Sequence, residues 1–181
     1  MNSMDISMTI SGFVKNPKPN KFKVGDILIG LKSSGIHSNG TTAVRKIFGK
    51  EFREEFTVPT RIYIDEILKM LSKCKVHGMM HITGGAFTKF KDILGQADAH
   101  IYHPPKLGPH KIFMEIHKRG VPSKDMYTTF NCGIGFVISA PKSEAKKVLS
   151  LLKDADVIGE VVKGKGSVFI RSAFDGKIVK L

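Results

Sequence analysis

The chain has 181 residues, of which 41% are hydrophobic and 25% are charged, as in an ordinary globular protein. Its 29 basic and 16 acidic residues give a net charge of +13, which attracts anions such as nucleotides and phosphorylated metabolites. The lysines are scattered with no run of five, Trp is absent and there are only 3 Tyr, so nucleic-acid binding is a minor alternative.

The amino-terminal part of the chain predicts two strands and two helices separated by turns. Two prolines between Asn16 and Asn20 fix φ and remove donors, and the segment from Ser33 to Gly40 is rich in Ser, Gly and Asn. In chain order we expect a strand over 4–14, a turn over 16–20, a buried strand over 26–31, a loop over 33–40, and helices over 41–48 and 59–73. The last helix has a broad apolar face made by Ile62, Ile64, Ile67, Leu68 and Leu71.

The remainder of the chain alternates strands with helices in the same way. Gly84-Gly85 marks a turn, Gly120 is placed to end a helix, and Pro141 is placed to begin one. We expect strands over 78–82, 97–102 and 130–140, a short helix ending near Gly95, helices over 111–119 and 141–153, and a hairpin of 157–162 with 168–171. The sequence therefore predicts an α+β domain in which helices flank a mixed β-sheet.

The sequence gives no sign of a membrane segment, a metal site or a disulfide framework. No run approaches the roughly 18 apolar residues of a membrane helix, and the amino terminus lacks the basic patch and apolar core of a signal peptide. Cys74 and Cys132 have no metal-ligand spacing, and two cysteines favour a reducing compartment. We therefore expect one cytoplasmic domain over residues 1–181.

The segment from Gly30 to Gly40 is the first that carries chemistry. It lies between a buried strand and a helix, where small residues allow a close approach to a ligand and the free amides of the helix start point outward. Together with three serine hydroxyls, these amides would form a phosphate cradle. His37 within it could bind an anion or shuttle a proton near neutral pH. The alternative is a plain Gly/Ser turn with an exposed histidine.

The segment from His77 to Gly85 predicts a second anion-accepting corner. His81 lies on one face of a strand, and Thr83 and two glycines follow where the strand hands over to a helix. The alternative for His81 is a hydrogen-bonded core histidine. His77 and His81 share a face of the strand but lie about 13 Å apart, too far for one metal ion.

The segment TTFNCGIG, residues 128–135, is the third. Gly133 and Gly135 lie two apart on one face of the expected strand, which allows a ligand or a neighbouring strand to come close. Cys132 has no basic neighbour in sequence to lower its pKa, so we expect it to pack rather than to act as a nucleophile. Arg61, expected in the first turn of a helix, is either held by a ligand or an acidic partner or exposed to solvent.

Taken together, these segments resemble the carboxyl-terminal domain of the aminoimidazole ribonucleotide synthetases. GDILIGLKSSGIHSNG is similar to the loop that opens this domain. VPTRIY, VHGMMHITGGAF, GVPSKDMYTTFNCGIG and VIGEVV follow in the order of the family. The resemblance covers the chain from about Ile6 to Val162.

The resemblance implies a purine-pathway enzyme that uses ATP to close the imidazole ring of formylglycinamidine ribonucleotide. In this family ATP phosphorylates the amide oxygen, and the amidine nitrogen then attacks and expels phosphate. The enzyme is a homodimer of two-domain chains, and the amino-terminal domain, which this chain lacks, supplies most contacts to ATP and Mg²⁺. The present chain would be the carboxyl-terminal half, inactive alone and needing that domain or subunit as its partner.

By motif match, one groove would bind the phosphorylated substrate, and His37 would have the catalytic role of orienting the amide or stabilising charge. The other groove residues would be Ser33, Ser34, Gly35, Ser38, Asn39, Gly40, His81, Thr83, Gly84, Gly85 and Asn131. After Gly85 the sequence departs from many relatives, with Ala86 in place of a third glycine. This leaves open a divergent, non-catalytic binding or assembly module, or another phosphoryl-activating enzyme of the thiamine-monophosphate kinase or selenophosphate synthetase type.

Overall fold

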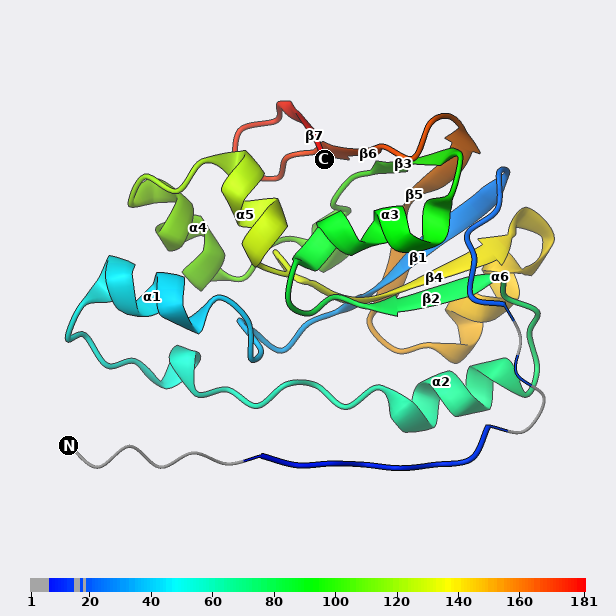
Figure 1. Cartoon of the computed structure of the whole chain (residues 1–181), viewed down its shortest axis with the longest axis horizontal. Helices are drawn as coiled ribbons and strands as arrows, with labels where there is room; N and C mark the ends of the chain where they lie inside the picture. Colours follow the sequence, from blue (N-terminus) through cyan, green and yellow to red (C-terminus); the bar gives the residue numbers. More distant parts are fainter. Residues whose placement is uncertain (1–6, 15–16, 18) are drawn as a thin grey trace.

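A seven-stranded mixed sheet forms the centre of the computed structural model, which describes residues 7–14, 17 and 19–181 (Figure 1). The strands are β1 (Asp26–Lys32), β2 (Gly78–His81), β3 (Ala97–Ile101), β4 (Ile134–Pro141), β5 (Ala155–Lys163), β6 (Val168–Arg171) and β7 (Ile178–Lys180). Their order is β2-β4-β1-β5-β3-β6-β7, with β3 and β6 parallel and the other neighbours antiparallel. The predicted α+β class with a mixed sheet is confirmed.

Helices cover both faces of this sheet. The α-helices are α1 (Thr41–Phe48), α2 (Ile64–Leu71), α3 (Lys91–Leu94), α4 (Lys111–Lys118), α5 (Ser123–Thr129) and α6 (Lys142–Leu151). Short 3-10 helices are η1 (Glu54–Phe56), η2 (Ala86–Phe90) and η3 (Pro105–Leu107). None of the helices in the described part of the chain is long and apolar enough to cross a membrane.

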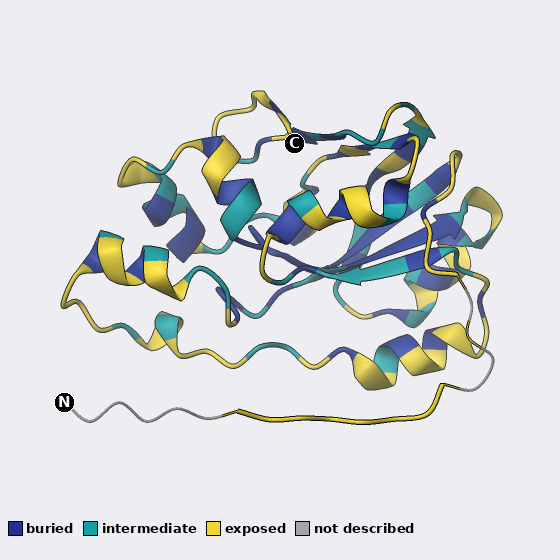
Figure 2. Ribbon diagram, viewed as in Figure 1, coloured by how far each residue is buried: buried dark blue, intermediate teal, exposed yellow. Residues whose placement is uncertain are grey.

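The two faces have separate apolar cores because strand residues alternate in direction. On β1, Leu28 packs with the larger core beneath α1, η2, α3, α4 and α5, whereas Ile29 and Leu31 pack with α2 and α6. The larger core holds fully buried aromatic rings such as Phe113 and Tyr127. In Figure 2 the buried residues lie along the central strands and the inward faces of the helices. The loops at the ends of β1, β2 and β4 are thereby held on a rigid base.

Two expectations about the amino-terminal part of the chain were wrong. Residues 7–14 pair with no strand and are exposed, and residues 4–6 of the predicted strand lie outside the described part. The helix expected from Pro59 begins only at Ile64. In the segment before it, Arg61 Nη1 and Tyr63 Oη both donate to the carbonyl oxygen of Lys32, each at 3.0 Å, and so tie this segment to the end of β1. Arg61 also forms an ion pair with Glu66 at 2.9 Å, so an acidic partner holds it.

Two further expectations failed in the carboxyl-terminal part. The strand predicted from Phe130 begins at Ile134, because α5 and a turn with positive φ at Cys132 and Gly133 precede it. The hairpin of 157–162 with 168–171 does not form, because β3 lies between β5 and β6. The carboxylate of Asp98 on β3 accepts the amides of Lys165 and Ser167, both at 2.8 Å, and so places β3 inside the predicted turn.

Candidate functional site

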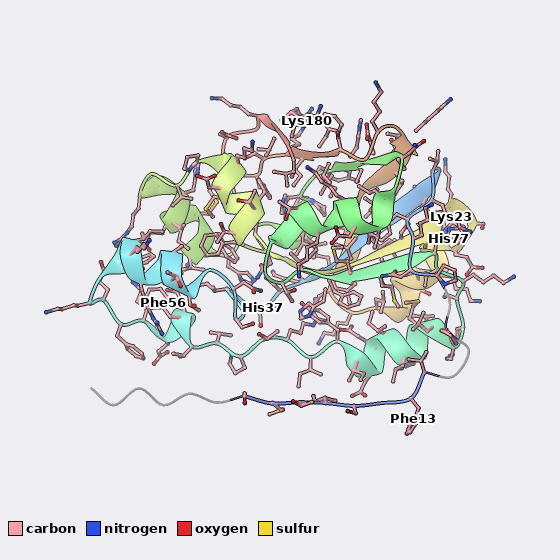
Figure 3. All side chains as sticks on the ribbon, in the orientation of Figure 1. Phe13, Lys23, His37, Phe56, His77 and Lys180 are labelled. Carbon is pink, nitrogen blue, oxygen red and sulfur yellow. The ribbon has the colours of Figure 1, made fainter. Side chains whose placement is uncertain are left out.

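The structure brings the two predicted anion-binding corners together. The loop of residues 33–40 follows β1, and residues 82–85 follow β2. Strand β4 lies between β1 and β2 and pairs with both. The rings of His37 and His81 have centroids 6.1 Å apart. A Cβ atom built on Gly84 would lie 3.5 Å from Asn39 Oδ1, so the two loops are in contact. In Figure 3, His37 is labelled near the centre of the picture, between the ribbons of α1 and α2.

Hydrogen bonds to two other segments fix the path of the first loop. The Ser33 amide donates to Gly133 O at 3.0 Å, and the Ser34 hydroxyl donates to Pro59 O at 2.7 Å. The loop ends at Gly40, whose φ of 75° favours glycine. A side chain at Gly40 would also run into the ring of Phe130. The backbone conformation and the packing therefore both require glycine where the loop becomes α1.

His37 lies buried inside the loop in an unusual backbone conformation. Its φ is 62°, a region that non-glycine residues seldom occupy, and its side chain is 5% exposed. Burial, with smaller effects from the nearby His81, His110 and Arg61, lowers the pKa of His37 to about 4. The imidazole is therefore neutral at neutral pH.

The hydrogen bonds of His37 define which ring nitrogen carries the proton. Its Nε2 accepts the amide of Ser34 at 3.0 Å, so in the neutral ring Nδ1 must carry the hydrogen. Nδ1 has no hydrogen-bond partner among the described residues and is shielded from solvent. His37 therefore presents one buried, unused N–H donor.

Unpartnered buried polar atoms gather at this site. Among the described residues, five buried side-chain polar atoms lack a partner, on Ser33, His37, His81, His103 and Glu144. Three of these, Ser33 Oγ, His37 Nδ1 and His81 Nε2, belong to the two predicted corners. Since native proteins rarely leave such groups unpaired, their clustering points to a ligand or partner that supplies the missing bonds.

An aromatic shelf lies beside the two corners and was missed by the sequence reasoning. The ring of Tyr63 lies 5.6 Å from that of His81 and 5.3 Å from that of Phe136. Burial raises the pKa of Tyr63, so its hydroxyl stays protonated and donates to Lys32 O. Gly135 lies under this shelf, where a Cβ atom would meet Tyr63 Oη and lie 2.9 Å from His37 Cε1. A surface pocket of about 470 Å³, lined partly by Tyr63, His81 and Phe136, opens over the shelf.

The predicted site residues fall into a solvent-facing set and a supporting set. Ser38, Gly84 and Gly85 are exposed, and Ser34, Asn39, Gly40, His81 and Thr83 are half-buried. The amides of Gly84 and Gly85 donate to no acceptor within the described part of the chain. Gly35 is buried, and Ser33 lies beneath the loop with its carbonyl accepting a bond from His110 Nε2 at 2.9 Å.

Asn131 belongs to the supporting set and does not line the groove surface. It is 2% exposed, and its Nδ2 donates to the carbonyls of Gly35 at 2.8 Å and Ile36 at 3.3 Å. Its Oδ1 accepts the amide of Gly133 at 2.9 Å. Cys132 beside it is fully buried, and burial raises its pKa well above the usual value, in agreement with a packing role.

Comparison with known proteins identifies the family. The family model described as "AIR synthase related protein, C-terminal domain" matches residues 23–171, which include both corners and the aromatic shelf. The chain belongs to this family. Its curated relatives include phosphoribosylformylglycinamidine cyclo-ligases from Methanocaldococcus jannaschii, 37% identical over 90% of this chain and 53% of that protein, and from Pyrococcus horikoshii, 35% identical over 95% and 55%. The chain thus spans about half the length of the curated relatives it matches.

Solved structures support the AIR synthase-related fold. The hydrogenase maturation protein HypE superposes with a TM-score of 0.64 at 18% identity, covering 93% of this chain and 56% of HypE. A structure titled "T. maritima PurL complexed with FGAR" gives a TM-score of 0.57 at 10% identity, covering 91% of this chain and 28% of that one. At these identities the likeness shows a shared fold.

The donor atoms of this AIR synthase-related domain do not suit Mg²⁺. Within residues 7–14, 17 and 19–181, no group of three or more His, Cys, Asp or Glu side chains is arranged so that it could hold a metal ion. The groups that meet at the two corners are imidazoles, amides and hydroxyls, whereas Mg²⁺ prefers carboxylate and phosphate oxygens. The two corners therefore do not fit Mg²⁺ as a ligand.

Proposed function

We propose that this chain is the substrate- and phosphate-binding half of a phosphoribosylformylglycinamidine cyclo-ligase of purine biosynthesis. The complete enzyme would use ATP to close formylglycinamidine ribonucleotide to aminoimidazole ribonucleotide. An amino-terminal domain or subunit would supply most contacts to ATP and Mg²⁺. Residues 1–181 would act as one domain.

The observation that carries the proposal is the group of three unpartnered polar atoms on Ser33, His37 and His81 at the junction of the two loops. A ligand with acceptor oxygens would complete the hydrogen bonds of the Nδ1–H of His37 and of the free amides of Gly84 and Gly85. The net charge of +13 favours an anionic ligand. The named activity of relatives at 35–37% identity fits such a ligand.

The geometry suggests how His37 would act. Because Nε2 is already bonded to the Ser34 amide and the ring is neutral, His37 is poorly placed to accept a proton. It would instead donate a hydrogen bond from Nδ1 to an amide oxygen, and so orient it and stabilise negative charge that develops there. The buried site would strengthen this bond, since water cannot compete for it.

The supporting residues would hold this donor in place. Asn131 fixes the carbonyls of Gly35 and Ile36, and Gly135 leaves room for the rings of His37 and Tyr63. Alone, the chain would bind anions without turnover, because the groups that hold ATP would lie on the other half.

Exposed apolar side chains next to the site favour an assembled enzyme. Ile62 is 82% exposed, and Ile64 and Leu68 on α2 are each 59% exposed. Such an apolar surface is typical of a protein interface and would be covered by the amino-terminal half or by a second copy in a homodimer. Both cysteines are free and buried, which fits a cytoplasmic location.

The test is reconstitution of ring closure. The chain would be mixed with the separately produced amino-terminal half of the M. jannaschii relative, ATP, Mg²⁺ and formylglycinamidine ribonucleotide. We expect activity that requires both halves and falls at least tenfold with His37→Ala, as for loss of one transition-state donor. Two folded, associated halves without activity would favour the non-catalytic assembly module, and full activity of His37→Ala would make His37 structural.

A further inference from the structure

Residues 7–14 are the most exposed apolar segment in the described part of the chain. Met8, Ile10, Phe13 and Val14 are 82%, 86%, 108% and 77% exposed. Figure 2 shows the segment as a continuous exposed stretch, and Figure 3 shows Phe13 pointing away from the rest of the molecule. Contiguous exposed apolar residues of this kind mark an interaction site.

The segment has the pattern of a β-strand without a partner. Met8, Ile10 and Val14 would share one face, and Thr9 and Ser11 would lie on the other with Phe13. Its backbone is extended and makes no hydrogen bond with another described residue. An extended chain with free amides and carbonyls and one apolar face can add to the edge of a sheet.

The comparisons bear on where this segment belongs. The domain model of the family begins at residue 23, so the segment lies ahead of it. The P. horikoshii relative nevertheless aligns over 95% of this chain, which leaves at most about nine residues unaligned, so the shared sequence reaches back into 7–14. That relative has nearly half its length outside the match. The segment is therefore shared, at least in part, with this longer relative and lies outside the carboxyl-terminal domain model of the family.

We infer that residues 7–14 form an edge strand that completes a β-sheet of the amino-terminal half. The inference rests on the proposed function, in which that half is the partner. It also gives the partner a position, because Val14 lines one surface pocket together with Leu71 at the end of α2. A sheet that takes up the segment would lie next to the exposed Ile64 and Leu68 of α2 and hence beside the candidate site.

The experiment compares two charge substitutions on opposite faces of the strand. The full chain would carry Ile10→Glu or, as the matched control, Ser11→Glu, and each would be titrated with the amino-terminal half of the P. horikoshii relative. Both positions are exposed, so thermal melting should show both variants folded. We expect Ile10→Glu to weaken the complex at least tenfold and Ser11→Glu to change it less than threefold, because burial of one isoleucine is lost only in the first.

Hydrogen exchange supplies a second readout of the same complex. The amides of residues 7–14 should exchange freely in the chain alone and be protected in the complex. A complex in which they stay unprotected, equal binding of the two variants, or no complex would overturn the inference. A dimer of the chain alone that Ile10→Glu dissociates would overturn it too, because the occupant would then be a second copy. Protection without ring closure would leave the inference standing and remove the cyclo-ligase assignment.

Discussion

Replacement of Asn131 by alanine tests whether this side chain holds the His37 loop. The amide group of Asn131 makes two short hydrogen bonds, from Nδ2 to Gly35 O at 2.8 Å and from Gly133 N to its Oδ1 at 2.9 Å. A third, to Ile36 O, is longer at 3.3 Å. Asn131 is buried, so water cannot simply take its place.

The expected loss follows from the groups left behind. Each buried backbone group without a partner destabilises the fold by about 1–3 kcal/mol. Two such groups lower the free energy of unfolding by about 2–6 kcal/mol, a large share of the roughly 5–15 kcal/mol that stabilises a typical domain. The released loop should also expose the amides of residues 33–40 to exchange.

The assay is urea unfolding of the wild type, Asn131→Ala and Thr128→Ala. Thr128, three residues before Asn131, is the matched control because its hydroxyl makes only one hydrogen bond within the described residues, a solvent-exposed one to Asp125 O at 3.1 Å. We expect Thr128→Ala to lie within about 0.5 kcal/mol of the wild type, as surface substitutions usually do. An Asn131→Ala variant as stable as Thr128→Ala, with an unchanged exchange rate in the loop, would refute the supporting role.

Two further predictions concern Gly135 and two buried histidines. Gly135→Ala should lower the free energy of unfolding by about 1–3 kcal/mol, because the new Cβ would overlap Tyr63 Oη and crowd His37. The control Gly12→Ala should be neutral, because a Cβ at Gly12 has no neighbour within 4 Å. Equal melting temperatures of the two variants would contradict this prediction. Burial lowers the pKa of His37 and His103 to about 4, below the roughly 6.5 of the unfolded chain, so the unfolded state binds more protons between these values. The free energy of unfolding should therefore decrease as the pH is lowered from 6 to 4.5, by about 1 kcal/mol per pH unit for each histidine. A stability that stays flat over this range in urea titrations would show that the two imidazoles are not buried in neutral form.

The sequence predicted the unit of β1, loop and α1 because its signals are local. A buried apolar run, a stretch of Ser and Gly, and a renewed helical spacing at Val44 follow one another in the chain. The second corner, at Thr83 to Gly85, has the same kind of signal. That the two corners meet also follows from the fold, since β4 lies between β1 and β2.

Features that depend on distant contacts were not predictable. The turn signal near Gly164 is real, but the carboxylate of Asp98 occupies the turn and β3 separates the two expected hairpin strands. The donor role of Asn131 toward the loop and the bond from Ser34 to His37 Nε2 likewise appear only once the chain is folded. The segment VPTRIY was noted as a motif, yet the shelf made by Tyr63 needs Phe136 from another strand.

The central claim is that the corners around His37 and Gly84 together hold an anionic group. Titration of the ¹⁵N-labelled chain with inorganic phosphate, followed by NMR, tests it most directly. We predict that the amides of Ser38, Gly84 and Gly85 and the Nδ1–H of His37 shift together, with one dissociation constant in the millimolar range or below. Shifts confined to scattered lysines, or separate saturation of the two loops, would contradict the account.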